Sequence, residues 1–195
     1  MVCYNGPVEE GEKVLRPLRE FGSPLGDEIR PMPYTEIQQI TGPMLQAGRR
    51  NYIKSIMVRD IGEAVIDTLV EYFTRVPSPF TLLVFQQLGN AANRVGKDAT
   101  AFNHRNAGYE LIMHAIWLDQ GEDEKNIRWT RELAATTLPL TGGSDYINQM
   151  GTEAEEGADR IRAAFGPNYQ RLVAVKQKYD PTNLFRHNQN IKPAG

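Results

Sequence analysis

Apolar residues recur with two different periods along the chain, and the short-period stretches predict β-strands. Residues 51–58, 80–88 and 109–118 are rich in β-branched and aromatic side chains, in alternating or continuous apolar runs. The stretch 109–118 is the longest of the three, and the centre of 80–88 is predicted to be largely buried. Shorter strands are predicted at residues 27–32 and 146–148.

A helical period of about 3.6 residues dominates the segments between these strands. The predicted helices cover residues 8–21, 34–40, 61–75, 122–137, 153–165 and 168–179. In the helix 61–75, the side chains expected to face the core are Ala64, Ile66, Leu69, Val70 and Phe73. Strands and helices are mixed without strict alternation, and no helix separates 80–88 from the next strand. The pattern predicts an α+β fold, with a mainly antiparallel sheet and helices packed on one face.

Composition and charge exclude several classes of protein. The sequence is 41% hydrophobic and 24% charged, as in ordinary globular proteins, and it is long enough for a single domain over residues 1–195. A net charge of −2 favours neither a nucleic-acid nor a membrane partner. No apolar run reaches the roughly 20 residues of a membrane span. Because Cys3 is the only cysteine and the start lacks a secretory signal pattern, a cytoplasmic location is expected.

The last stretch of the chain combines a helix, a stop and a run of side-chain amides. The helix is expected to end at Asp180-Pro181, because proline disfavours helical geometry in the residue before it. The amides that follow are Asn183, Asn188, Gln189 and Asn190. Leu184, Phe185 and Ile191 are expected to anchor this tail, so that its amides can meet a flat heterocycle. The alternative is an ordinary, solvated polar terminus.

A carboxylate lies on the longest predicted strand. Alternation places Glu110, Ile112 and His114 on one face of that strand and Tyr109 with its alternate neighbours on the other. A carboxyl group among apolar neighbours keeps its proton to higher pH, and it can act as a base once it is deprotonated. The alternative is that Glu110 is an edge or surface residue.

Three scattered histidines, His104, His114 and His187, have no cysteine partner and no i,i+4 spacing, so no metal site is predicted. A structural or substrate-lining role is the better interpretation of each histidine. The sequence also lacks the glycine patterns of a Rossmann nucleotide site or a P-loop, and it lacks the G-x-S-x-G elbow of serine hydrolases.

The tail from Lys176 to Ile191, with Tyr179-Asp180-Pro181 and Asn183-Leu184-Phe185 at its centre, closely resembles the C-terminal segment of berberine bridge enzyme-like FAD-linked oxidases. The resemblance extends over nearly the whole chain. It implies a substrate-binding part over residues 1–145 that continues into the berberine bridge enzyme-like segment 146–195. We expect the family's FAD-binding domain to have no counterpart in these residues.

The resemblance also implies site residues. Glu110 matches the position of an active-site acid on the strand after His104-Arg105, where Asn103 replaces the family's usual proline. Tyr146 and Asn148 match a segment that lies against the flavin, whereas Gln149 stands where some members have a tyrosine base. Catalysis is thus expected from Glu110 and Tyr146. Flavin contacts are expected from Tyr146, Asn148, Asn188, Gln189 and Asn190, and substrate contacts from His104, Arg105, His114 and Gln149.

Two functional hypotheses follow. In the first, the chain is the substrate-binding portion of a FAD-dependent oxidoreductase that acts on a small organic substrate and requires a FAD-binding domain or subunit. FAD would then be bound only in the complete enzyme. In the second, the chain is a stand-alone, non-catalytic binding domain that has kept the fold and pairs as a homodimer. A glutamine cannot act as a base at physiological pH, so Gln149 favours the second hypothesis.

Overall fold

The computed structural model describes residues 2–150, 157–187 and 189–194. The chain divides into two compact units, residues 1–47 and 48–195. Within the described residues, no helix combines the length and apolarity that crossing a membrane requires. The assignment of residues 1–195 to a single domain, with a functional boundary at residue 145, stays a prediction.

The first unit contains helices α1 (Val8–Arg19) and α2 (Tyr34–Ile37). The strand predicted at residues 27–32 is wrong, because this stretch forms no strand ladder in the structure. It is bonded to the end of α1 instead. Arg19 donates to the Asp27 carboxylate and, at 2.6 Å, to the Ile29 carbonyl. Side-chain bonds therefore hold an extended segment that has no strand partner.

The second unit is built on a three-stranded antiparallel sheet with the order β1-β3-β2. Its strands are β1 (Arg50–Val58), β2 (Leu82–Gln87) and β3 (Tyr109–Trp117), which confirms the three main strands predicted from the sequence. The central strand β3 pairs Glu110 with Met57 on β1 and with Gln86 on β2. Long-range pairing thus brings three separate segments to one position on the sheet.

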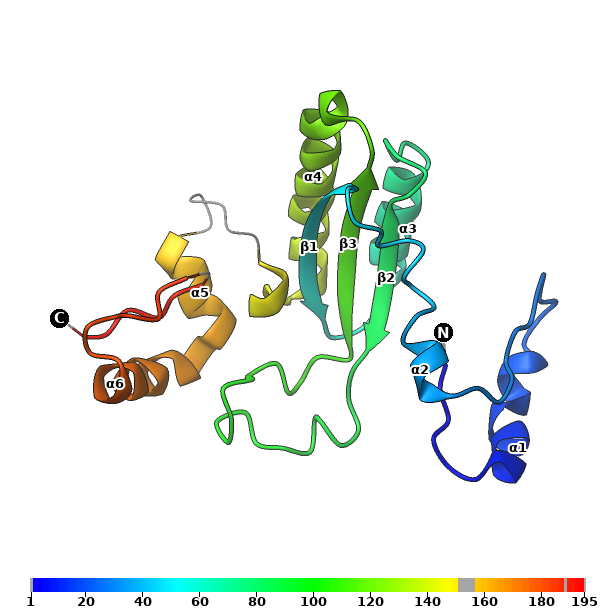
Figure 1. The fold of residues 1–195 in the computed structure, drawn as a ribbon, viewed down its shortest axis with the longest axis horizontal. Helices are drawn as coiled ribbons and strands as arrows, with labels where there is room; N and C mark the ends of the chain where they lie inside the picture. The colour runs from blue at the N-terminus through cyan, green and yellow to red at the C-terminus, as the bar shows by residue number, and fades with distance from the viewer. Residues whose placement is uncertain (1, 151–156, 188, 195) are drawn as a thin grey trace. The chain divides into compact units, whose positions relative to one another are not determined.

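Helices α3 (Glu63–Phe73) and α4 (Asp123–Thr141) lie side by side on the same face of the sheet (Figure 1). The core between helices and sheet is formed by Ile56, Val58, Val65, Leu69, Tyr72, Leu111, Met113, Trp129 and Leu133. The predicted α+β fold, with an antiparallel sheet and helices on one face, is therefore confirmed. Helix α4 extends past the predicted end and includes Pro139.

The predicted core face of α3 is only partly correct. The buried side chains are Val65, Leu69 and Tyr72, whereas Ile66, Val70 and Phe73 are exposed. Apolar residues occupy more of this helix than one packing surface can cover, so periodicity alone does not select the buried stripe.

The burial predicted for the centre of the strand 80–88 is also wrong. Strand β2 lies at the edge of the sheet, and Val84 at its centre is 41% exposed. A continuous apolar run is typical of a strand that is covered on both faces. Among the described residues, helices cover only the face of β2 that carries Leu83 and Phe85.

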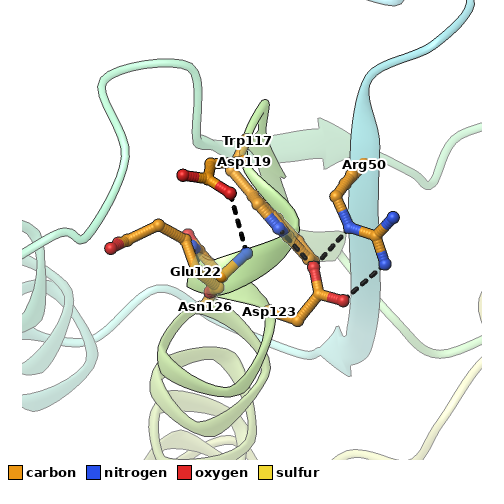
Figure 2. A network of polar contacts seen from close by, with 7 residues as sticks. Arg50, Trp117, Asp119, Glu122, Asp123 and Asn126 are labelled. Carbon is orange, nitrogen blue, oxygen red and sulfur yellow. Dashed lines mark hydrogen bonds and ion pairs between the residues drawn. The ribbon is translucent and has the colours of Figure 1, made fainter.

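A polar network joins the start of α4 to the ends of two strands (Figure 2). Arg50, at the start of β1, binds both carboxylate oxygens of Asp123. Trp117, at the end of β3, donates its indole N–H to Asp123 at 2.7 Å. Asp119 accepts from the Gly121 N–H at 2.8 Å and caps the short helix η1 (Gln120–Glu122). This network fixes where α4 begins relative to the sheet.

The C-terminal segment contains η2 (Ile147–Gln149), α5 (Gly157–Phe165), η4 (Gly166–Asn168) and α6 (Tyr169–Tyr179). It is joined to the long loop that connects β2 and β3. Asn103 donates to the Ala164 carbonyl at 3.1 Å, Asn168 donates to the Lys97 carbonyl at 2.9 Å, and Arg171 donates to the Asp98 carbonyl at 3.2 Å. The start predicted for α5 at residue 153 lies outside the described residues.

Candidate functional site

Strand alternation and the pairing register define the face of the sheet that points away from α3 and α4. We call this the second face. Its side chains are Asn51, Ile53, Ser55 and Met57 on β1, Leu82, Val84 and Gln86 on β2, and Glu110, Ile112, His114 and Ile116 on β3. The predicted placement of Glu110, Ile112 and His114 on one face is confirmed by the opposite placement of Leu111 and Met113, which belong to the helix-covered core.

Glu110 is the acidic residue of the second face, and it is only 4% exposed. The alternative that it is a surface residue is therefore wrong. Its Oε1 atom is buried and has no hydrogen-bond partner among the described residues. Burial raises the pKa of Glu110, and the nearby Ser55 hydroxyl partly opposes this rise. A carboxyl group in this state is suited to proton transfer, because its charged form is not held in a tight ion pair.

His114 lies four residues further along the same strand face and is half-buried. Burial lowers its pKa below the ordinary value for histidine, which favours the neutral imidazole at physiological pH. A neutral imidazole can both donate and accept a hydrogen bond. The second face thus carries two titratable side chains, and burial favours the uncharged form of each.

His104 lies in a buried cluster between two loops. Its Nδ1 atom is 3.3 Å from the Ser144 hydroxyl oxygen, and its ring packs at 5.4 Å from that of Phe102 and at 6.1 Å from that of Tyr146. Burial lowers the pKa of His104, and a bond to the Ala164 carbonyl together with the charge of Asp145 partly opposes this effect. The cluster packs Tyr146 against the loop that precedes β3.

Arg105, the neighbour of His104, is bonded within its own loop. Its guanidinium donates to the Ala92 carbonyl at 2.9 Å and to the Thr100 hydroxyl at 2.7 Å, and it lies over the Phe102 ring. These contacts fold the loop between β2 and β3 on itself. The substrate-binding roles predicted for His104 and Arg105 stay predictions.

Tyr146, Asn148 and Gln149 lie at the short helix η2 rather than on a strand, so the strand predicted at residues 146–148 is wrong. The segment just before η2 is bonded to β1 at Ser144, whose carbonyl accepts the Met57 N–H at 2.8 Å. The chain then turns, and the Asn148 amide donates to the Tyr146 hydroxyl at 2.8 Å. The two side chains, which a strand would present side by side on one face, are thus bonded to each other at a short helix instead.

The tail after α6 is held largely by polar contacts, and of its three predicted apolar anchors Ile191 is half-buried. Asp180 binds Lys176 and accepts the N–H groups of Leu184 at 2.7 Å and Phe185 at 3.0 Å. The predicted anchors Leu184 and Phe185 are exposed, Phe185 by 77%. Asp180 satisfies backbone donors after the proline stop, and this local bonding needs no apolar contact to hold the turn.

The predicted amides of the tail have different surroundings. Gln189 donates to the Met150 carbonyl at 2.6 Å, and Asn190 is half-buried. Asn188 lies outside the described residues. A groove of about 390 Å³ runs between α6 and the tail, and its lining includes Gln189, Asn190 and His187. The described residues contain no cluster of three or more histidine, cysteine or acidic side chains able to hold a metal ion.

Backbone contacts connect the second face to the Tyr146 segment. Met57, which lies opposite Glu110, bonds to Ser144, and Ser144 in turn contacts His104. Gly143 packs directly against the Met57 carbonyl, where an added Cβ would lie 1.5 Å from the oxygen. Sequence reasoning missed Ser55, Gly143 and Ser144. Ser55 could have been found only by combining strand alternation with the correct pairing of β1 and β3.

The chain is similar to a known family of proteins and to several of its members. The family described as berberine and berberine-like matches residues 145–192. The FAD-linked oxidoreductase YgaK of Bacillus subtilis is 32% identical over 97% of this chain and 42% of its own length. A FAD-linked oxidoreductase of Dictyostelium discoideum is 28% identical over 99% of this chain and 42% of its own length.

Among solved structures, 6-hydroxy-D-nicotine oxidase from Arthrobacter nicotinovorans superposes with a TM-score of 0.75 at 22% identity, over 97% of this chain and 43% of that protein. This likeness concerns the fold. The chain thus spans about two fifths of the length of the curated relatives named here. It is related to the berberine bridge enzyme-like FAD-linked oxidoreductases and corresponds to a part of them.

Proposed function

We propose that the chain is the substrate-binding portion of a FAD-dependent oxidoreductase, and that Glu110 on the second face is its general base. The observation that carries the proposal is the buried, unpaired Oε1 of Glu110 on the sheet of a chain related to FAD-linked oxidoreductases. Oxidation of a C–H group requires removal of a proton from the attached O–H or N–H group. A carboxylate with few partners can accept that proton.

Several side chains suit a flavin ring. Tyr146, Asn148, Gln189 and Asn190 supply a phenol and amide groups, which match the hydrogen-bonding edge of a heterocycle. When bound, FAD supplies the two-electron acceptor. The protein's own part is to orient the substrate, to exclude water and to accept a proton at the Glu110 carboxylate. His114, on the same face, could donate to a substrate oxygen in its neutral form.

A chimera tests the proposal. The part of YgaK that matches this chain would be replaced by residues 1–195, and the purified protein would be examined for bound FAD by its absorbance. Anaerobic flavin bleaching would then be followed with 6-hydroxy-D-nicotine, after the oxidase that shares this fold, as the first probe. Retention of FAD and bleaching by a probe are expected. A folded chimera that retains no FAD would contradict the proposal.

The role of Glu110 is tested in the same chimera. A positioned general base contributes roughly 10²–10⁴-fold, so Glu110→Gln should slow flavin bleaching by about that factor while FAD remains bound. The two side chains are nearly isosteric, so circular dichroism should be unchanged. The matched control is Glu124→Gln on α4, which removes an exposed carboxylate and should leave the rate unchanged. Bleaching of Glu110→Gln at the unmodified rate would show that Glu110 is not the base.

A further inference from the structure

Two polar side chains at neighbouring positions of the second face each carry a buried atom without a hydrogen-bond partner among the described residues. Ser55 is 3% exposed and Glu110 is 4% exposed. The Ser55 Oγ and the Glu110 Oε1 are both without a partner among the described residues. Buried polar atoms usually have partners, because each unpaired group has lost its hydrogen bonds to water. Two unpaired atoms on one face therefore need a common explanation.

The register places these two residues diagonally across the β1–β3 pair. Met57 is opposite Glu110 and Ser55 is opposite Ile112, so Ser55 and Glu110 are diagonal neighbours. Such neighbours lie about 7–8 Å apart along the backbone, within the reach of a long side chain such as glutamate. The serine hydroxyl can rotate freely about its C–O bond and can turn its proton toward an acceptor. No hydrogen bond of normal geometry joins them in this structure.

The Ser55 hydroxyl favours the ionised form of Glu110, because a hydrogen bond to a carboxylate is stronger than one to a protonated carboxyl group. A carboxylate accepts hydrogen bonds. Gln86 lies directly opposite Glu110 on β2 but is exposed, whereas the Ser55 hydroxyl is buried beside Glu110 and lowers its pKa. Apart from Ser55, the residues of β1 and β2 on the second face are Asn51, Ile53, Met57, Leu82, Val84 and Gln86, none of which titrates. His114 is the other titratable group on that face, and no charged group contributes to the electrostatics of Glu110.

We propose that Ser55 is a positioning residue that donates a hydrogen bond to the ionised carboxylate of Glu110 and so keeps this buried base available and correctly aimed. The inference rests on the proposed function, in which Glu110 is the base. The inference adds Ser55, a residue of β1 that affects catalysis only through its contact with Glu110. Without the Ser55 hydroxyl, the buried carboxylate would lose a donor and would keep its proton to higher pH.

The protonation of the Glu110 carboxyl group can be measured directly by NMR, without flavin. Carboxyl-¹³C glutamate would be incorporated into the full chain, and the Glu110 signal would be identified by its loss in Glu110→Gln. Its titration midpoint would then be compared in the unmodified chain, Ser55→Ala and Ser55→Thr. The midpoint should move to higher pH in Ser55→Ala and return toward the unmodified value in Ser55→Thr, which restores the hydroxyl.

The matched control is Ser78→Ala, which also removes a buried serine hydroxyl. Ser78 donates to the Ile116 carbonyl at 2.6 Å and therefore has a structural role away from Glu110. Ser78→Ala should lower the melting temperature of the protein and leave the titration midpoint of Glu110 unchanged. An unmoved midpoint in Ser55→Ala would overturn the proposal, and so would equal shifts in Ser55→Ala and Ser78→Ala. If Ser55→Ala does not fold, Ser55→Cys keeps the size with a weaker donor and should shift the midpoint in the same direction.

The YgaK chimera separates this proposal from the proposed function. In Ser55→Ala, the acid limb of the pH profile of flavin bleaching should move with the carboxyl titration and by the same amount. If the titration moves while the profile does not, Ser55 acts on Glu110 but not on catalysis, and the positioning role fails. If Glu110→Gln itself bleaches normally, the proposed function fails, whatever the carboxyl titration shows.

Discussion

At the scale of single residues, the site depends on close backbone approaches as much as on reactive side chains. The segment that carries Tyr146 reaches the sheet through the bond between Met57 and Ser144. Gly143 allows this approach, because any side chain there would overlap the Met57 carbonyl. His104 and Ser144 then hold the segment from the side of the long loop. Small residues thus determine where a larger aromatic residue lies.

We expect Gly143→Ala to destabilise the protein, because the new Cβ would lie 1.5 Å from the Met57 oxygen and the backbone would have to shift. Overpacking of this kind typically costs about 1–3 kcal/mol. Urea unfolding measures the change. The control is Gly96→Ala, where an added Cβ meets no atom within 4 Å, and there the stability should be unchanged or slightly increased. Equal stability of the two variants would contradict the close approach seen here.

At the scale of elements, α4 is fixed to the sheet by one carboxylate shared between two strands. Asp123 binds the Arg50 guanidinium and the Trp117 indole (Figure 2). The hydrogen bonds from Arg50 lower the pKa of Asp123 in the folded protein, as does the bond from Trp117. Because β1 and β3 also carry the second face, this connection contributes to the rigidity of the sheet that bears Glu110.

The lowered pKa of Asp123 makes the contribution of this network depend on pH. Stability from the pair is fully present above the ordinary aspartate value of 3.8 and is lost as the pH falls through the lower pKa of the folded state. We therefore expect Arg50→Gln to be less stable than the unmodified chain at pH 7, with a difference that narrows as the pH falls below 4.

Denaturant unfolding across this pH range measures the difference. Arg128→Gln is the control, because it breaks an exposed i,i+4 pair with Glu124 and should change stability little at any pH. If the difference in unfolding free energy between Arg50→Gln and the unmodified chain stays constant across the pH range, the stabilisation by Arg50 does not depend on the ionised Asp123 carboxylate.

At the scale of the whole molecule, several surfaces of the second unit expose apolar side chains, and two of them belong to the sheet and its helices. One is the second face, where Val84 is 41% exposed on the edge strand β2. The other is the outer side of α3, where Val70 is 60% exposed beside a groove of about 510 Å³. Exposed apolar patches commonly mark contact surfaces. Homodimerisation through the sheet therefore stays a prediction, with α3 as the competing surface.

We expect the isolated chain to associate at high concentration through the second face. Val84→Lys should weaken this association by roughly tenfold or more, because it removes an apolar contact and adds a charge. Sedimentation equilibrium measures the effect. Val70→Lys is the matched variant on α3 and should associate like the unmodified chain. If only Val70→Lys weakens association, the contact surface is α3, and a strict monomer would contradict the prediction altogether.

Much of the fold and part of the site could be predicted without the structure. Strand periodicity identified β1, β2 and β3 and placed Glu110 and His114 on one face, because alternation is a property of the chain itself. The motif from Tyr179 to Asn183 with its flanking amides was sufficient to indicate the family. The helices, the antiparallel arrangement and the absence of known nucleotide-binding motifs also followed from local pattern.

Only the tertiary structure decided which residues become neighbours. Ser55 meets Glu110 through pairing between strands that lie more than 50 positions apart in the sequence, and no local pattern specifies that register. The edge position of β2, the buried stripe of α3 and the turn at Tyr146 also depend on what covers or pairs with each element. The sequence by itself therefore determined the three main strands, most of the helices and the acid on β3, whereas long-range packing decided the burial of Glu110 and the identity of its neighbours.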